Sequence, residues 1–271
     1  MNQSLERTDK AKFGPWAIVT GASSGIGEEF ARQLAANRIN LVLVARRLAL
    51  LNELGARLTE ADGIQCKSIP LDLSQENFID RIHNETKNLD IGLLVSNAGA
   101  GLPGRFLDQN VDDLRSILRL NSLSHLSLTH YFGNRFARRG RGGVLLVSAM
   151  GAVNGIPFMA NAAATKSYMH SLGRGLHREF LDSGVHLTVL LPGLIDTPVL
   201  EKLGLTKEAL PMKPLSVEQC VREGLHALGA NEMEVIPGRL NRVMNRVIPA
   251  WVMRRMNGEA QVRQRIIGSF A

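Results

Sequence analysis

Short apolar runs alternate with segments of helical periodicity along most of the chain. The run at 41–45 is continuously apolar, which is typical of a strand that a parallel sheet buries on both faces. The seven runs that we predict as strands cover residues 16–19, 40–45, 64–71, 91–96, 143–148, 185–191 and 234–236. The helices predicted between them cover residues 28–37, 48–61, 75–89, 111–139, 161–181 and 217–228. This alternation predicts one doubly wound α/β domain with a parallel seven-stranded sheet.

The two ends of the chain depart from this alternation. Residues 2–13 are polar and predict a loose arm without an apolar signal segment. No apolar run approaches the ~20 residues of a membrane span, and we therefore expect a cytoplasmic chain. Cys66 and Cys220 lack metal-ligand spacing and are predicted to be buried thiols in a reducing compartment. The alternation ends near residue 238, which predicts one domain over 1–238 and a C-terminal extension over 239–271.

A glycine-rich turn at Thr20–Gly27, TGASSGIG, joins the first predicted strand to the first predicted helix. Its three glycines allow a sharp bend and a close approach to a ligand. The following helix presents free N–H groups and the positive end of its dipole, which suits a pyrophosphate. The spacing is G-x-x-x-G-x-G, not the common G-x-G-x-x-G, and such a turn can also be a simple tight connection. The strand before it, the helix after it and the further strand at 40–45 favour a dinucleotide site in a Rossmann fold.

Two arginines, Arg46 and Arg47, follow the second predicted strand. At this place a carboxylate would hold the ribose 2′-OH of NAD, whereas an arginine suits the 2′-phosphate of NADP. No acidic residue stands at this strand end. The sequence therefore favours NADP(H), with solvated arginines at the start of a helix as the alternative interpretation.

Polar and small residues follow several other strands, at the sheet edge where ligands of such folds bind. Asp72 could accept a hydrogen bond from an adenine amino group, or could cap the next helix together with Ser74. The small residues at 97–101 would let the backbone lie against a flat cofactor, and Asn97 can tie neighbouring strands together. Ser148 ends the fifth strand and therefore lies at the same edge.

Asn121 lies inside the apolar pattern of the long helical segment at 111–139. Because asparagine has only a modest helix propensity, a role in a site is one interpretation of this residue. A partly exposed or locally bonded amide is the alternative.

Together these pieces resemble the short-chain dehydrogenase/reductase family, and the resemblance spans nearly the whole chain. It rests on the glycine turn, Asn97-Ala98-Gly99, Asn121, Ser148, Lys166, and Pro192-Gly193 with Thr197, in family order and at family spacing. The resemblance implies a carbonyl–alcohol oxidoreductase whose domain at 1–238 binds both NADP(H) and the substrate. The cofactor-binding residues that it implies are Gly21, Ser23, Ser24, Gly25, Ile26, Gly27, Arg46, Arg47, Asp72, Leu73, Asn97, Ala98, Gly99, Lys166, Pro192, Gly193, Ile195 and Thr197.

The resemblance also implies roles at a catalytic centre. Ser148 would orient and polarise the substrate carbonyl, and Asn121 would support a proton-relay water. Lys166 would bond the nicotinamide ribose and lower the pKa of a catalytic tyrosine. That tyrosine stands four residues before the lysine in the family, one helical turn away, but here the position holds Ala162. A methyl group cannot donate a proton to the alkoxide that forms as hydride arrives, and general acid–base catalysis is typically worth ~10²–10⁴-fold.

No neighbour of Ala162 is an obvious replacement for the missing tyrosine. Tyr168 lies about 240° around a helix from it, and His170 lies about 12 Å along the helix axis. Three explanations compete: an engineered knock-out of a working reductase, a natural non-catalytic homologue that binds NADP as a sensor or scaffold, and chemistry run by Ser148, Lys166 and water alone. We favour the first.

The residues expected near the nicotinamide are mostly apolar. A pocket lined by them would lack fixed charges and suit a lipid-like, steroid-like or aromatic carbonyl, although several of them could simply pack in the core. Residues 198–214 are predicted to form an inserted short helix or a flap, of the kind that often closes over a site. The predicted substrate-binding residues are Met150, Val153, Phe158, Met159 and Leu194.

The net charge of +7 is concentrated in the C-terminal extension. Seven arginines stand there against one acid, which gives 7 − 1 = +6 and leaves the rest of the chain near neutral. This distribution argues against a general nucleic-acid-binding surface. Apolar residues recur at helical spacing among these arginines, at Leu240, Val243, Met244, Val247 and Ile248. We expect a basic amphipathic helix that makes a peripheral membrane contact or docks a partner, with packing on the domain or on a second subunit as the alternative.

The family resemblance further implies that the chain is an oligomer. A homodimer or homotetramer would form through the predicted helices at 111–139 and 161–181. The sequence does not say which of the two it is.

Overall fold

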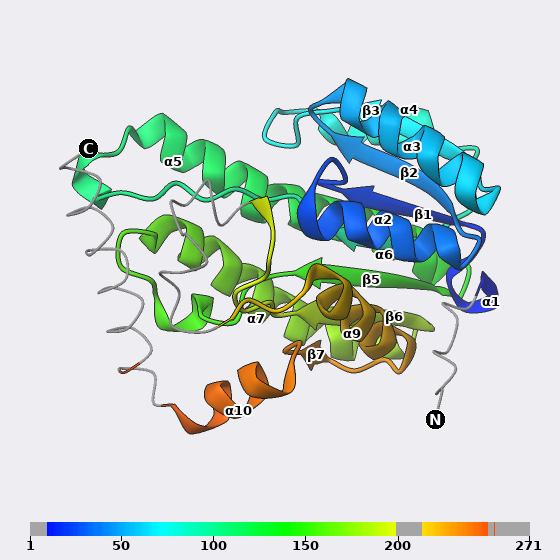
Figure 1. Ribbon diagram of the computed structural model, residues 1–271. Coiled ribbons are helices and arrows are strands. Elements are labelled where there is room, and N and C mark those ends of the chain that lie inside the picture. The colour runs from blue at the N-terminus through cyan, green and yellow to red at the C-terminus, as the bar shows by residue number, and fades with distance from the viewer. Residues whose placement is uncertain (1–9, 199–212, 249–251, 253–271) are drawn as a thin grey trace.

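The computed structural model describes residues 10–198, 213–248 and 252. Within them, seven strands form one sheet in the order β3-β2-β1-β4-β5-β6-β7, and every pairing is parallel (Figure 1). The doubly wound α/β prediction is confirmed. The strands are β1 (Trp16–Thr20), β2 (Asn40–Ala45), β3 (Cys66–Pro70), β4 (Ile91–Ser96), β5 (Gly142–Val147), β6 (Val185–Leu190) and β7 (Glu234–Val235).

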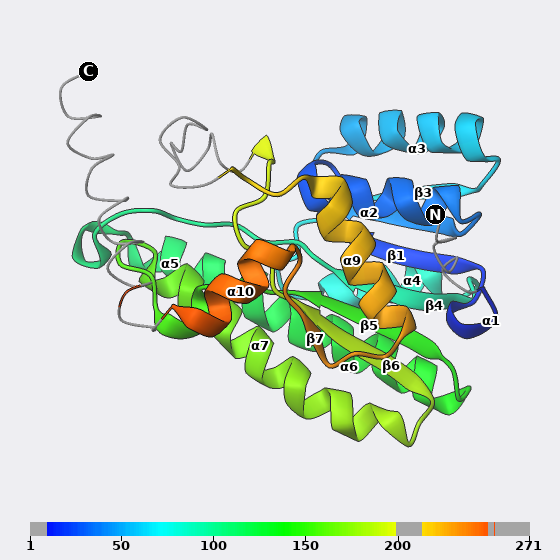
Figure 2. The same ribbon diagram turned by 60° about the horizontal axis from the view of Figure 1, so that its bottom comes forward.

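Helices cover both faces of the sheet and enclose two apolar layers (Figure 2). In β1, Ala17 and Val19 point into one layer and Ile18 into the other, which explains the continuous apolar runs of the sequence. The first layer is covered by α2 (Gly25–Ala36), α3 (Leu48–Asp62) and α9 (Val217–Gly229), and the second by α4 (Phe78–Thr86), α6 (Ser124–Arg138) and α7 (Ala160–Leu181).

The long helical segment predicted at 111–139 is divided into three parts. An α-helix, α5 (Val111–Leu118), is followed by a π-helical segment, η2 (Arg119–Leu123), and then by α6. Short π-helical segments are rare and often occur at functional sites. This one contains Asn121, so the helix changes its geometry at the residue that the sequence analysis singled out.

The prediction of a loose arm over 2–13 is wrong for the part that the structure describes. Residues 10–13 form a short helix, α1 (Lys10–Phe13), and the Phe13 ring is buried edge-on against His186 with ring centroids 5.7 Å apart. Gly92 and Gly143 leave room for Phe13, because a Cβ at either position would overlap it. The segment is mostly polar, but it contains Phe13, whose packing partners lie far along the chain.

The predicted flap falls largely outside the described residues, including its apolar residues at 199, 200, 203 and 205. Its two ends are described, and they are joined. Asp196 N donates to Leu215 O at 3.0 Å, and Leu215 N donates to Leu194 O at 2.9 Å. The residues that flank the predicted flap are therefore paired with each other just after β6.

Candidate active site

The glycine turn after β1 is shaped by backbone conformations and contacts that exclude side chains. Gly21 and Gly25 have φ values of +68° and +60°, in the left-handed region that favours glycine. A Cβ at Gly27 would overlap the carbonyl oxygen of Gly21 and would lie 2.6 Å from Asn97 Nδ2. The first turn of α2 is thereby pressed onto the glycine turn and onto the end of β4.

The N-terminus of α2 is suited to an anion. Ser24 is its N-cap residue but makes no side-chain capping hydrogen bond in the described part of the chain. The first N–H groups of the helix and its positive dipole end are thus available to a negatively charged group. Thr197 faces this turn from the loop after β6, since its Cβ lies 3.4 Å from where a Cβ of Gly25 would be.

Arg47 reaches back from the end of β2 to the same turn. Its guanidinium donates to Ser23 Oγ at 2.9 Å and to Ser24 Oγ at 3.3 Å, while the Arg46 side chain is exposed. One arginine and two hydroxyl groups therefore lie together at the edge of the turn. These are groups that hydrogen-bond a phosphate.

Thr20 ties β1 to the residues that follow β4. Its hydroxyl oxygen accepts from the backbone N–H groups of Asn97 at 2.9 Å and Ala98 at 3.0 Å. Asn97 Nδ2 donates in return to the Thr20 carbonyl oxygen at 3.0 Å. The predicted role of Asn97 in joining neighbouring strands is confirmed.

The structure brings two of the predicted catalytic residues, Asn121 and Lys166, together at Gly99. A Cβ at Gly99 would lie 3.2 Å from Lys166 Nζ and 3.3 Å from Asn121 Oδ1. Lys166 Nζ donates to the Val147 carbonyl oxygen at 2.8 Å, and the Ser148 hydroxyl donates to the Lys166 carbonyl oxygen at 2.7 Å. Desolvation by burial lowers the pKa of Lys166 to about 8.

Asn121 is fully buried, and its amide is bonded on both sides. Its Oδ1 accepts from Ala100 N at 2.9 Å, and its Nδ2 donates to the Ala100 carbonyl oxygen at 2.8 Å and to Thr165 Oγ1 at 3.1 Å. The alternative of a partly exposed amide is therefore wrong. The amide links the segment after β4 to α7, which carries Lys166.

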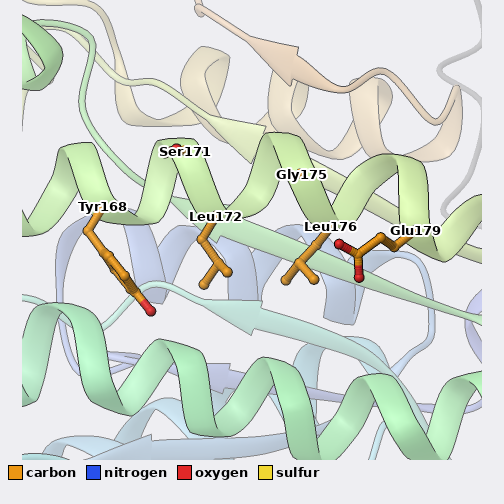
Figure 3. Close-up of a pocket in the computed structure, with 6 residues that line it drawn as sticks. All are labelled: Tyr168, Ser171, Leu172, Gly175, Leu176 and Glu179. Carbon is orange, nitrogen blue, oxygen red and sulfur yellow. The ribbon is translucent and has the colours of Figure 1, made fainter.

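Ala162 lies one turn before Lys166 on α7 and is buried, with 8% of its surface exposed. Neither of the neighbours considered above reaches it. Tyr168 projects from the outer face of α7 beside Leu172 and Leu176, along a surface pocket of about 260 Å³ (Figure 3). His170 is bonded through Nε2 to Glu234 Oε2 on β7 at 2.6 Å. The position that the family resemblance assigns to the acid–base tyrosine therefore holds a methyl group.

Asp72 does not cap a helix as one interpretation of the sequence suggested. Its Oδ1 accepts from both the backbone N–H and the hydroxyl of Ser74, at 2.9 and 2.7 Å, in a local turn. The next helix, α4, begins only at Phe78 with Asn77 as its N-cap residue. The predicted start at residue 75 is wrong because this turn separates the strand from the helix. Leu73, which follows Asp72, is buried under the sheet.

Most of the residues predicted for substrate binding come from the loops after β5 and β6. Met150 N donates to the Pro192 carbonyl oxygen at 2.9 Å, which holds the two loops together. Phe158 has a left-handed backbone conformation, φ +60°, which is uncommon for a bulky residue. The side chains of Met150, Phe158, Met159 and Leu194 are half-buried, and that of Val153 is mostly exposed.

Sequence reasoning missed His125, which lies one turn after Asn121 and is 1% exposed. Its Nε2–H donates to the Ala98 carbonyl oxygen at 2.7 Å, and its Nδ1 accepts from the Ser96 hydroxyl at 2.7 Å. Burial, reinforced by the charge of Lys166, lowers the pKa of His125 to about 3, so the imidazole is neutral. The only signal in the sequence is its spacing of four residues from Asn121, which places both on one helical face.

A second missed residue is Asn241 on α10 (Arg239–Val247), in the segment that the sequence assigns to the C-terminal extension. It is buried against the loop after β6: a Cβ at Gly193 would lie 3.1 Å from Asn241 Nδ2. The start of the extension therefore packs on the loop that the family resemblance assigns to cofactor binding. Ile195, in the same loop, is buried in the core.

Comparison with known proteins agrees with this geometry. Residues 15–208 match the profile of the family described as short chain dehydrogenase. The chain belongs to the short-chain dehydrogenase family. A very-long-chain 3-oxoacyl-CoA reductase of Neurospora crassa is 32% identical over 247 residues, which cover 89% of this chain and 73% of that reductase.

Two solved structures support the same assignment. A 7beta-hydroxysteroid dehydrogenase has a TM-score of 0.83 at 26% identity, over 92% of this short-chain dehydrogenase and 98% of the other chain. A short-chain dehydrogenase from Sphingobium yanoikuyae in complex with NADPH has a TM-score of 0.78 at 26% identity, over 94% and 95% of the two chains. The class of the protein is therefore an oxidoreductase of carbonyl and alcohol groups.

Proposed function

We propose that this short-chain dehydrogenase binds NADP(H) and an apolar, lipid-like carbonyl or alcohol, and that a change from tyrosine to alanine at position 162 has removed most of its turnover. One observation carries this proposal. Lys166 and Asn121 meet at Gly99, and the Ser148 hydroxyl donates to the Lys166 carbonyl oxygen, but the position one turn before Lys166 on α7 holds the methyl group of Ala162.

The cofactor proposal rests on the groups around the glycine turn. The N-terminus of α2 would bind the pyrophosphate, and Arg47 with Ser23 and Ser24 would bind the 2′-phosphate of NADP. The relative solved with NADPH supports this choice. When bound, the nicotinamide ring supplies or accepts the hydride.

The roles of the protein's own groups follow from where their protons lie. The Ser148 hydroxyl would donate a hydrogen bond to a substrate oxygen after giving up its present bond to the Lys166 carbonyl. The Lys166 ammonium is protonated at neutral pH, because its pKa is about 8. Neither group replaces a phenol that shuttles a proton to the reacting oxygen, and we therefore expect Ser148, Lys166 and water to sustain only slow turnover.

The substrate proposal rests on the apolar loops beside the site and on the relatives. Met150, Phe158, Met159 and Leu194 offer apolar side chains without a fixed charge. The relatives named above are a very-long-chain 3-oxoacyl-CoA reductase and a 7beta-hydroxysteroid dehydrogenase. Both names support a bulky, lipid-like substrate class for this chain.

The decisive test compares the chain with its Ala162→Tyr variant. NADPH oxidation is measured with a panel of steroid ketones, 3-oxoacyl thioesters and aromatic ketones. We expect a gain of about 100-fold or more on at least one substrate, because acid–base catalysis is restored. Ala164→Tyr, at an exposed position of the same helix, is the matched control and should give no gain. No gain from Ala162→Tyr on any substrate, with NADPH still bound, would leave a non-catalytic NADP-binding regulator or scaffold as the function.

A second test addresses the choice of cofactor. Arg47→Ala should weaken the binding of NADPH by about 10-fold or more, since a charge-assisted hydrogen bond to the 2′-phosphate is lost. NADH, which lacks that phosphate, should bind equally well to both proteins. Binding is measured by the fluorescence of the reduced nicotinamide, with Arg81→Ala at an exposed position of α4 as control. Equal losses for both cofactors would contradict the assignment of Arg47 to the phosphate.

We also propose that the protein is a homodimer or homotetramer in a cytoplasmic, reducing environment. The outer face of α7 exposes Tyr168 and Leu181, and α6 exposes Leu126, which supports pairing through these helices. Cys66 and Cys220 are free thiols, and burial raises the pKa of Cys220 to about 12, which makes its thiol unreactive. Light scattering of Leu126→Asp against the parent tests the assembly: an unchanged mass would contradict it.

A further inference from the structure

The C-terminal helix α10 is fixed to the domain along one side. Its Asn241 side chain is buried against Gly193. On α9, the Glu223 carboxylate accepts from Arg242 at 2.7 Å and from the backbone N–H of Gly238, which precedes the helix, at 3.0 Å. These contacts set the rotation of α10 about its own axis, and they determine which residues face outward.

The outward side carries an apolar stripe. Leu240, Val243 and Val247 are 60%, 58% and 70% exposed. Their spacing of three and four residues places them within about 60° of one another around the helix. Figure 1 places α10 at the edge of the molecule, beyond β7.

Two arginines border this stripe, between it and Arg242, the residue that pairs with Glu223. Arg239 and Arg246 lie about 40–60° around the helix from Val243, and both are exposed. Among the described residues, neither forms an ion pair with an acid, whereas Arg242 is paired with Glu223. The helix itself contains no acidic residue. Its exposed surface therefore combines apolar side chains with unneutralised positive charge.

We propose that this α10 face, formed by Leu240, Val243 and Val247 with Arg239 and Arg246, docks on the surface of a bilayer that contains anionic lipid. An apolar stripe beside basic residues is the arrangement of a helix that lies in the interface plane, with its apolar side in the acyl boundary and its cations at the headgroups. Nucleic acid would engage the arginines but would leave the stripe in water. This assignment does not depend on the reaction proposed above.

The sequence beyond α10 adds positive charge that is complementary to anionic lipid. It contributes four more arginines, Arg254, Arg255, Arg263 and Arg265, against the single acid Glu259. Among the residues that the structure describes, no helix has both the length and the apolar character needed to cross a membrane. Because Asn241 contacts Gly193, docking through α10 brings the loop after β6 close to the lipid.

The experiment measures co-sedimentation of the full chain with vesicles. We expect binding to phosphatidylcholine vesicles that contain about a third phosphatidylserine, and much weaker binding to pure phosphatidylcholine. Raising the salt from about 0.1 M to about 1 M should weaken the binding several-fold, because the arginine contribution is screened.

Two variants test whether α10 makes the contact. Leu240→Ser/Val243→Ser/Val247→Ser should reduce vesicle binding by at least about 100-fold, since three largely exposed apolar side chains no longer enter the lipid. Arg239→Gln/Arg246→Gln should reduce it by roughly 25-fold on anionic vesicles, about fivefold for each charge. All five positions are exposed, so circular dichroism and NADPH binding should stay at parental values.

Matched controls replace exposed residues elsewhere. Arg81→Gln/Arg138→Gln removes two charges from α4 and α6, and Leu48→Ser removes an exposed leucine from α3. Neither should change vesicle binding. Absence of binding to anionic vesicles, or binding that the triple serine variant leaves intact, would overturn the proposal. If the triple serine variant instead changes the oligomeric mass, the stripe is an interface with a second copy of the chain. If duplex DNA competes with the vesicles for the protein, and this competition depends only on the arginines, the surface binds nucleic acid.

Discussion

The buried imidazole of His125 makes a prediction that can be worked out quantitatively. His125 is neutral because both of its nitrogens are committed, Nε2–H to the Ala98 carbonyl oxygen and Nδ1 to the Ser96 hydroxyl. A proton on Nδ1 would displace the Ser96 hydrogen bond and place a charge in the core near Lys166. Protonation of this residue should therefore destabilise the folded chain.

The size of the effect follows from the two pKa values. Burial lowers the pKa of His125 to about 3, whereas an imidazole in an unfolded chain titrates near 6.5. Because the unfolded chain binds the proton and the folded chain does not, the stability contributed by His125 is fully present above about pH 6.5 and is lost as the pH falls towards 3. At 1.36 kcal/mol per pH unit, the free energy of unfolding should fall by about 2 kcal/mol between about pH 7.5 and pH 5.

The assay is urea unfolding at constant protein concentration across this pH range, for the parent and for His125→Gln. A glutamine amide can donate to Ala98 O and accept from Ser96, but it does not titrate. The range stops at about pH 5 because hydrogen-bonded carboxylates titrate lower. Glu223 is one such carboxylate. Burial raises its pKa, but hydrogen bonds, including one from Gln219, outweigh the effect of burial and leave the pKa below its usual value.

We expect His125→Gln to lose about 2 kcal/mol less than the parent over the same range, even if it is less stable at every pH. His130→Gln on the exposed side of α6 controls for the loss of an imidazole and should keep the parental fall. Identical pH dependence in the parent and in His125→Gln would refute the assignment of a neutral, proton-excluding imidazole.

Two further predictions concern packing. Gly27→Ala should destabilise the fold by about 3 kcal/mol or more and abolish NADPH binding, because its Cβ would overlap the Gly21 carbonyl oxygen. The control is Gly229→Ala, because a Cβ there meets nothing within 4 Å. In the same urea titration this control should be neutral or slightly stabilising. Phe13→Ala should cost about 3–5 kcal/mol, since it empties a site enclosed by β4 and β5. A loss below about 1 kcal/mol would mean that α1 is the loose arm that its polar sequence suggested.

Much of this protein could be predicted from local patterns. Continuously apolar runs such as 16–19 and 41–45 indicate a parallel sheet, because strands that are covered on both faces have few polar positions. The glycine turn could be predicted because glycine is favoured wherever the backbone takes positive φ or another chain segment approaches closely. The absence of a proton donor at Ala162 is equally local, since it depends only on a spacing of one helical turn from Lys166.

Only the tertiary structure decided which polar residues meet. His125 pairs with Ser96 and Ala98, 29 and 27 residues away, and Asn121 pairs with Thr165, 44 residues away. The same is true of Phe13 and Asn241, which the sequence placed in a loose arm and in an extension, and which pack against residues far along the chain. A buried polar or aromatic side chain is stabilised by partners that folding brings to it, and no periodicity along the chain encodes those partners.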